Sequence, residues 1–282
     1  MKASEIIRRR RRNRKNKVTR AVKSVSALRI LSFILICVAI TFIILCCVGY
    51  AVITQKLPSI ENFDDHFALA TEPTIIYDRT GTYPLLKLRY PTLEHVSLAI
   101  DEPDKPCFSS DLVKIIVATH QPNFWSSGGA DWQHWSNPDP VTVAERLVQQ
   151  TFPNQLGSGV EKAILTKILA TQITEIYGPQ AILTWYLNSA YFGQLAVGAD
   201  AAARTYLDKS ASDLNLSESI LLSAILDTPS LNPVDAPGVM RESYLAQIEK
   251  LEKNETLTEE EIRSVRSTNF VIFEPPPLEA EI

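Results

Sequence analysis

The longest apolar segment of the chain runs from Ile30 to Ile53 and contains no charged residue. A helix rises about 1.5 Å per residue, so this segment is about 36 Å long and exceeds the roughly 30 Å hydrocarbon core of a bilayer. A cleaved signal peptide is the alternative interpretation. Its apolar region is normally shorter, and no A-x-A cleavage site follows here. The pattern therefore predicts one N-terminal transmembrane helix.

Two short β-prone segments follow the apolar segment. Thr74 to Tyr77 ends at the turn signal Asp78-Arg79-Thr80-Gly81, and a second strand is expected at Tyr83 to Leu88. Together they predict a small hairpin within an otherwise irregular lead-in.

From Ser110 the hydrophobic pattern becomes helical, with Leu112, Ile115, Ile116 and Thr119 on one face. A loop rich in Gly, Pro, Ser, Asn and Trp follows at residues 122–140. Further helices are expected at residues 141–150, 160–176, 179–191, 198–206, 217–226 and 239–266. The pattern predicts a mainly α-helical domain with a β-rich lead-in.

Local signals set several boundaries. Ser217-Glu218 is a candidate cap before an apolar run, and Thr258 is a candidate N-cap of a short acidic helix. Three consecutive prolines within residues 273–282 predict a disordered end. The expected organisation is a tail at 1–29, a transmembrane helix at 30–53, a lead-in at 54–105, a helical domain at 106–266 and a Pro-rich tail at 267–282.

The net charge of −4 conceals a strong asymmetry. Residues 1–29 carry twelve Lys or Arg and one acid, Glu5, whereas the remaining residues carry 16 basic and 31 acidic side chains. Basic residues before an apolar helix keep the N-terminus in the cytoplasm. We therefore expect a single-pass plasma-membrane protein with an extracytoplasmic domain. We expect the basic run to contact the lipid bilayer and no nucleic acid to be a partner.

The cysteines and histidines predict neither a disulfide nor a metal site. Only Cys107 lies outside the apolar segment, so no disulfide is expected within the exported domain. His120 and His134 are too isolated to predict a zinc site.

The segment Trp185-Tyr186-Leu187-Asn188-Ser189-Ala190-Tyr191-Phe192-Gly193 is distinctive, and it is followed by Gly198, Tyr206 and Lys209 and by the turn Pro229-Ser230-Leu231-Asn232-Pro233. These landmarks, with the lead-in Ile76-Tyr77-Asp78-Arg79-Thr80-Gly81, resemble the peptidoglycan glycosyltransferases of glycosyltransferase family 51. The resemblance covers about residues 57–262. Many of these landmarks are packing residues, so they indicate the fold rather than the chemistry.

The resemblance implies a lysozyme-like, bilobal transglycosylase domain. Members of the family join lipid-linked disaccharides into glycan strands, with a carboxylate as general base and a divalent metal such as Mg or Mn. It also implies a lipid-linked peptidoglycan precursor and other cell-wall synthases as partners. The S-x-x-K and K-T-G motifs of penicillin-binding transpeptidases are absent from the sequence.

The first catalytic stretch of the family reads A-T-E-D-x-x-F-Y, and the matching stretch here begins Ala118-Thr119-His120-Gln121. His120 therefore occupies the position of the catalytic Glu, and Gln121 occupies that of the Asp.

The second stretch, G-G-S-T-I-T-Q-Q-L, matches residues 139–147. Thr142 is retained, but Asp-Pro replaces the two glycines, and Glu145 and Arg146 replace the glutamines. In the third stretch, R-K-x-x-E, Lys162 stands at the basic pair and Thr166 at the second catalytic Glu. A fourth acid of the family is replaced by Thr184. The resemblance places Gln121, Thr142, Glu145, Arg146 and Lys162 at substrate-binding positions, and no metal ligands are retained.

Loss of a positioned general base typically costs about 10²–10⁴-fold in rate. The sequence therefore predicts a catalytically degenerate family member that binds lipid-linked precursor or assists active synthases. One alternative is an active transferase that uses His120, or a relocated Glu145 or Glu161, as base. A solvated helix face is the expected place for both glutamates. The other alternative is a membrane scaffold with no sugar ligand.

Overall fold

A computed structural model of the chain describes residues 32–45, 47–49, 51, 55, 57–61, 63, 74–89, 98–100, 106–273 and 279–281. The tail predicted at residues 1–29 lies outside these residues, as does much of the lead-in predicted at 54–105. The chain divides into two compact units after Leu57, and each is considered by itself.

The first unit contains an apolar helix, Ser32–Gly49. Among the residues that the structure describes, it is the one helix long and apolar enough to cross a membrane, judged by length and composition. Its large side chains are exposed in the structure, with Phe33 at 67 % and Leu45 at 65 %. A helix that is apolar on all sides requires an apolar environment.

The second unit contains a three-stranded antiparallel sheet. Strands β1 (Thr74–Tyr77) and β2 (Pro84–Arg89) form the predicted hairpin, and β2 also pairs with β3 (Glu279–Glu281). The turn is stabilised by Asp78, whose carboxylate accepts hydrogen bonds from Thr80 Oγ1 at 2.6 Å and from Thr82 N at 3.0 Å. The expectation of a disordered end is wrong for residues 279–281, because they pair with β2.

The rest of the second unit is helical, which confirms the expected mainly α architecture. The helices are α3 (Ser110–His120), α4 (Val143–Thr151), α5 (Gly159–Ser189), α6 (Ala199–Leu207), α7 (Leu216–Asp227), α8 (Pro237–Lys253) and α9 (Glu259–Ser267). The 3₁₀ turns η1 (Phe124–Ser126), η2 (Trp132–His134) and η3 (Pro229–Leu231) lie in the connections.

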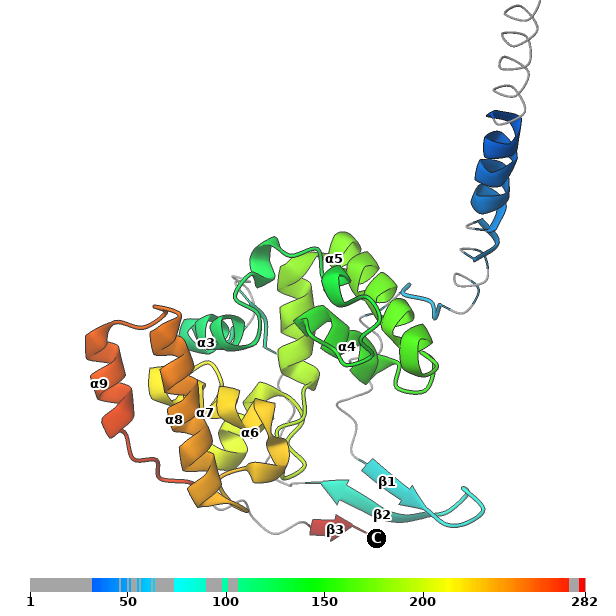
Figure 1. Ribbon diagram of the computed structural model, residues 1–282. Helices are drawn as coiled ribbons and strands as arrows, with labels where there is room; N and C mark the ends of the chain where they lie inside the picture. The colour runs from blue at the N-terminus through cyan, green and yellow to red at the C-terminus, as the bar shows by residue number, and fades with distance from the viewer. Residues whose placement is uncertain are drawn as a thin grey trace, which may run out of the picture. The chain divides into compact units, whose positions relative to one another are not determined.

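The helices form two groups (Figure 1). In one, α4 packs on α5, and in the other, α7 packs between α3, α6 and α8. The predicted face of α3, which includes Leu112, Ile115 and Ile116, is fully buried, and α3 packs against α7. Helix α7 is buried on nearly all sides from Ser217 to Leu226, and its second half, Ile220 to Leu226, is apolar except for Ser223.

Helix α5 passes from one group to the other and is broken at Gly178, whose φ of 81° and ψ of 164° are not helical. Pro179 follows at the start of the second half, where the absence of its N–H costs nothing. The two helices predicted at 160–176 and 179–191 are the two halves of α5.

Two predicted boundaries need correction. The N-cap of α7 is Asn215 rather than Ser217, and Asn215 and Glu218 form a reciprocal capping box. The helical stretch predicted at 239–266 divides into α8 and α9. Thr258 caps α9 as predicted, again with a capping box, here with Glu261.

Candidate functional site

His120 is the last residue of α3, and its side chain points into the protein. Only 2 % of that side chain is exposed. Its two nitrogens face α7: Nε2 lies 3.4 Å from Ser223 Oγ, and Nδ1 lies 3.3 Å from Asp227 Oδ1. Ser223 and Asp227 are one helical turn apart, so they share a face of α7.

This environment keeps the imidazole neutral. The pKa of His120 is lowered to about 4, mainly by burial; Asp227 opposes this shift, and the nearby positive charges of Arg146 and Lys250 contribute to it. At neutral pH the His120–Asp227 contact therefore joins a neutral ring to a carboxylate.

The spatial arrangement resembles that of a catalytic triad, with Ser223 in the place of the nucleophile, His120 in that of the base and Asp227 in that of the orienting acid. However, Ser223 is fully buried, and its Oγ lies 2.8 Å from Thr119 Oγ1. Because no substrate can reach a fully buried hydroxyl, this arrangement connects α3 to α7 and does not form a nucleophilic centre.

Gln121 and Thr142 hold the start of α4. Gln121 Oε1 accepts a hydrogen bond from Val143 N at 2.9 Å, and its Nε2 donates to Ser127 Oγ at 2.8 Å. Thr142 is the N-cap: its Oγ1 accepts from Glu145 N at 3.1 Å and donates to the Gly129 carbonyl at 2.6 Å. Both polar side chains thus satisfy backbone groups that the loop would otherwise leave unpaired.

Glu145 does not lie on a solvated helix face, and that expectation is wrong. The residue is 0 % exposed, and its Oε1 lies 3.0 Å from Nζ of Lys167, which is 1 % exposed. The carboxylate also accepts hydrogen bonds from Asp131 N and Val141 N, both at 2.8 Å. A buried charge is stable only when it is paired and hydrogen-bonded, and here the pair links α4 to α5. Glu161, in contrast, is exposed as expected.

Arg146 follows on α4 and approaches His120 and Tyr186. Its Nε is buried and has no hydrogen-bond partner among the residues that the structure describes. Tyr186 is 4 % exposed, and burial raises the pKa of its hydroxyl, while a hydrogen bond with Arg146 opposes that shift. Arg146 therefore brings positive charge to a largely buried cluster.

Thr166 lies on α5 and is 2 % exposed, and its Oγ1 accepts a hydrogen bond from Gln149 Nε2 at 3.3 Å. Lys162, one turn earlier, is half-buried. The structure therefore brings His120 and Arg146 into one cluster, whereas Thr166 bonds to Gln149 of α4 and Lys162 has no described contact with the cluster.

The sequence prediction missed four residues that approach His120 or Arg146. Tyr186 was interpreted only as a packing landmark, and Ser223, Asp227 and Lys250 were not singled out. One signal was available, because Ser223 and Asp227 are polar residues spaced by four in the apolar second half of α7. Nothing in the sequence pairs them with a histidine about one hundred residues earlier.

A divalent metal is implied by the family resemblance, but these residues do not suit one. In the described part of the chain, no group of three or more His, Cys, Asp or Glu side chains could hold a metal ion. Both oxygens of Glu145 are engaged by Lys167 and backbone N–H groups, and Asp227 contacts His120 and Gln247. No step through a metal is derived for this chain.

Comparison with known proteins decides the family. The family model described as Transglycosylase matches residues 103–252, which is more than half of the chain. The chain belongs to the transglycosylase family. The matched region begins before α3 and ends at the last turn of α8, so it includes every candidate site position from His120 to Lys250.

Among curated transglycosylase relatives, the Salmonella arizonae protein named biosynthetic peptidoglycan transglycosylase is 38% identical over 105 residues, covering 36% of this chain and 43% of that protein. Penicillin-binding protein 1A of Rickettsia felis is 30% identical over 139 residues, covering 44% of this chain and 18% of that protein. The chain thus matches less than half the length of either relative.

A crystal structure of penicillin-binding protein 1A from Haemophilus influenzae also aligns with this chain. The TM-score is 0.42 at 16% identity, and the alignment covers 72% of this chain and 21% of the other. The family assignment rests on the matched sequence region and not on this alignment.

Proposed function

We propose that this transglycosylase-family protein is catalytically degenerate. In this proposal it is anchored in the plasma membrane by a single helix, with its N-terminus in the cytoplasm and its helical domain outside. It binds lipid-linked peptidoglycan precursor or assists active synthases, and it does not polymerise glycan itself.

One observation carries the proposal: side chains at the expected acidic positions direct their polar atoms into the protein. His120 contacts Ser223 and Asp227. Gln121 forms hydrogen bonds with Val143 N and Ser127. Thr166 accepts a hydrogen bond from Gln149. Replacement of the acidic residues alone could leave the new side chains facing the substrate, where they could support other chemistry. Here the new side chains contribute to packing and capping.

General-base catalysis requires a group of suitable pKa within hydrogen-bond reach of the substrate hydroxyl. His120 is almost fully buried and has a lowered pKa, so it is a weak base with little access. Glu145 has both oxygens engaged and no exposed surface. These properties favour loss of transfer over transfer by a relocated base.

The amino-terminal segment supports membrane placement. The Ser32–Gly49 helix is long and apolar enough to span a bilayer, and the twelve basic residues of positions 1–29 favour a cytoplasmic N-terminus. A lipid-linked precursor lies at the same membrane, so anchoring would keep the domain near that ligand.

Precursor binding is supported by the charge of the His120 cluster. Arg146 is half-buried and Lys250 is exposed, and both bring positive charge close to His120. Positive groups that are at least partly accessible are suited to a diphosphate, because charge-assisted hydrogen bonds are stronger than neutral ones.

A thermal-shift titration of the full chain in detergent micelles tests precursor binding. Lipid-linked disaccharide should raise the melting temperature, because a ligand that binds only the native state stabilises it. Arg146→Gln should weaken the response. Arg263→Gln, at an exposed position of α9, should leave it unchanged.

The scaffold alternative makes the opposite prediction. A melting temperature unmoved by both the precursor and a transglycosylase-directed phosphoglycolipid inhibitor would contradict precursor binding and favour a scaffold. The active-transferase alternative requires that glycan be polymerised; where His120 is the base, His120→Ala should abolish the reaction.

A further inference from the structure

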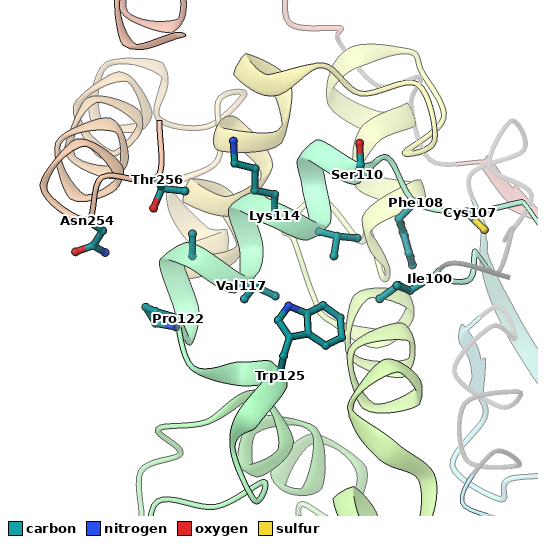
Figure 2. Close-up of a pocket in the computed structure, with 12 residues that line it drawn as sticks. Ile100, Cys107, Phe108, Ser110, Lys114, Val117, Pro122, Trp125, Asn254 and Thr256 are labelled. Carbon is teal, nitrogen blue, oxygen red and sulfur yellow. The ribbon is translucent and has the colours of Figure 1, made fainter. Parts of the chain in front are cut away.

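A cavity of about 880 Å³ opens on the side of α3 that does not contact α7 (Figure 2). Its wall includes Val113, Val117 and Ala118 of α3 together with Phe108 and Trp125. A volume of this size is typical of small-molecule sites, which are usually concave and mostly apolar. None of its lining residues belongs to the His120 cluster.

The apolar wall is not explained by the packing of α3. Leu112, Ile115 and Ile116 already supply the face that is buried against α7, whereas Val113 and Val117 project from an adjacent side of the helix. Trp125 adds a large aromatic surface and is 47 % exposed. Apolar side chains gathered in an open cavity favour an apolar ligand group.

The cavity has a polar end. Figure 2 shows Lys114, Asn254 and Thr256 at one end of the cavity, and Ile100, Phe108 and Trp125 toward the other. The lining is therefore amphipathic, with the Lys114 cation at the polar end and apolar side chains toward the other.

Lys114 retains donor capacity. Its described ion-pair partner is Glu261 at 3.8 Å, which is longer than a direct hydrogen bond, and both side chains are more than one third exposed. The contact is to Oε1 of Glu261, while Oε2 of the same carboxylate accepts from Thr258 N at 2.7 Å and from Thr258 Oγ1 at 2.9 Å and so holds the side chain at the start of α9. Lys114 can therefore bind an anionic group without breaking a strong contact.

We propose that this cavity binds one acyl chain of an anionic phospholipid, with the phosphate at Lys114. The apolar wall suits the hydrocarbon chain, and the cation at the polar end complements the charge of the headgroup. The inference rests on the membrane placement of the proposed function but not on its lost catalysis. A bound lipid here would attach the helical domain to the bilayer independently of the apolar helix.

Native mass spectrometry of the detergent-solubilised full chain tests the site, with phosphatidylglycerol and phosphatidylcholine supplied in equal amounts. We expect one retained phospholipid per chain, with phosphatidylglycerol preferred. Ala118→Trp should fill the cavity and lower retention roughly tenfold, equivalent to one decade in affinity. Lys114→Gln should reduce the preference for phosphatidylglycerol by roughly threefold, as expected for a partly exposed charge.

Val160→Trp is the matched control, because it adds the same side chain at an exposed position of α5. It should retain lipid as the wild-type protein does, and thermal unfolding of each variant checks the fold. Equal retention by Ala118→Trp and the wild type would overturn the proposal, as would retention of no phospholipid. Selective retention of added lipid-linked disaccharide, recognised by its mass, would also overturn it, while supporting the proposed function.

Tryptophan fluorescence provides a second measurement in vesicles of phosphatidylglycerol with brominated acyl chains. The quenching attributable to Trp125 is the difference between the wild type and Trp125→Phe. We expect this difference to be large. When the cavity is filled, the corresponding difference, between Ala118→Trp and Ala118→Trp/Trp125→Phe, should be close to zero. A difference of zero in the wild-type background would contradict the proposed position of the acyl chain.

Discussion

Two regions of this transglycosylase-family chain differ in how closely they follow the family motifs. Around the end of α5 the family landmarks remain, and Tyr186, Leu187 and Asn188 are buried there. Near the start of α4, the residues at most of the expected site positions differ from the motif, and Gln121 and Glu145 bind backbone N–H groups. We infer that a fold can be retained while polar positions of its site take on structural roles.

The retained region is held by close backbone contacts. Asn188 Oδ1 accepts from Leu98 N at 3.1 Å, and Asn188 Nδ2 donates to the Leu98 carbonyl at 2.7 Å. Tyr206 OH donates to the Phe192 carbonyl at 2.8 Å. Gly193 has a φ of 83°, and a Cβ there would lie 2.4 Å from the Pro229 carbonyl oxygen. These positions therefore specify the fold whether or not the protein is active.

The changed region depends on the buried Glu145–Lys167 pair. Removal of either partner alone leaves an uncompensated polar or charged group inside the protein, so Glu145→Gln or Lys167→Met should each cost about 3–5 kcal/mol. The double variant Glu145→Gln/Lys167→Met should recover much of this loss, because it removes both charges and restores the glutamine typical of the family. Urea unfolding of the helical domain measures all three values.

If the two single losses simply added in the double variant, the pair would not be coupled. That result would remove the main evidence that the changed region has been converted to structural use.

In the retained region, Gly193→Ala should cost roughly 3 kcal/mol, because it combines a left-handed backbone with a backbone clash. Gly238→Ala is the matched control, since a Cβ there meets no atom within 4 Å. It should be neutral or slightly stabilising within helix α8. Comparable thermal stability of the two variants would show that this landmark does not control the packing.

The His120 cluster predicts a pH dependence. Because the pKa of His120 is lowered to about 4 from an ordinary 6.5, the unfolded chain binds the proton more readily than the folded one between these values. Stability should therefore be fully present above pH 6.5 and should fall as the pH decreases toward 4, by up to about 3 kcal/mol.

His120→Gln should flatten this dependence. Urea midpoints measured between pH 4 and pH 7.5 provide the comparison. Parallel curves for the wild type and His120→Gln would show that His120 is not buried in its neutral form.

The smallest expected effect concerns Gln121, which binds the first helical N–H of α4. Gln121→Ala should cost about 1 kcal/mol, the usual value for loss of a helix cap. Gln133→Ala, at an exposed position of the neighbouring loop, should cost less than about 0.5 kcal/mol. Equal losses in thermal unfolding would mean that Gln121 has no structural role.

Sequence reasoning predicted the helices well because their apolar periodicity is strong and local. The buried face of α3, the break before Pro179 and the cap at Thr258 are all encoded by neighbouring residues. The short strand at residues 279–281 was missed because its pairing partner β2 lies nearly two hundred residues earlier in the chain.

The candidate site was predicted only in part for the same reason. Alignment with family motifs located His120 and Thr166, but burial of Glu145 depends on Lys167, a residue on another helix. Likewise, the neutral state of His120 depends on burial beneath residues of α4, α7 and α8. Such long-range pairings cannot be derived from the periodicity of one helix.

The proposed loss of glycan polymerisation is tested most directly by supplying the full chain, in phospholipid vesicles, with lipid-linked disaccharide and Mg²⁺, and by resolving the products on a gel. A family member that retains both carboxylates serves as the positive control. We expect no strands above background, since loss of one positioned base already costs about 10²–10⁴-fold. Strand formation at a rate near that of the control would contradict this expectation.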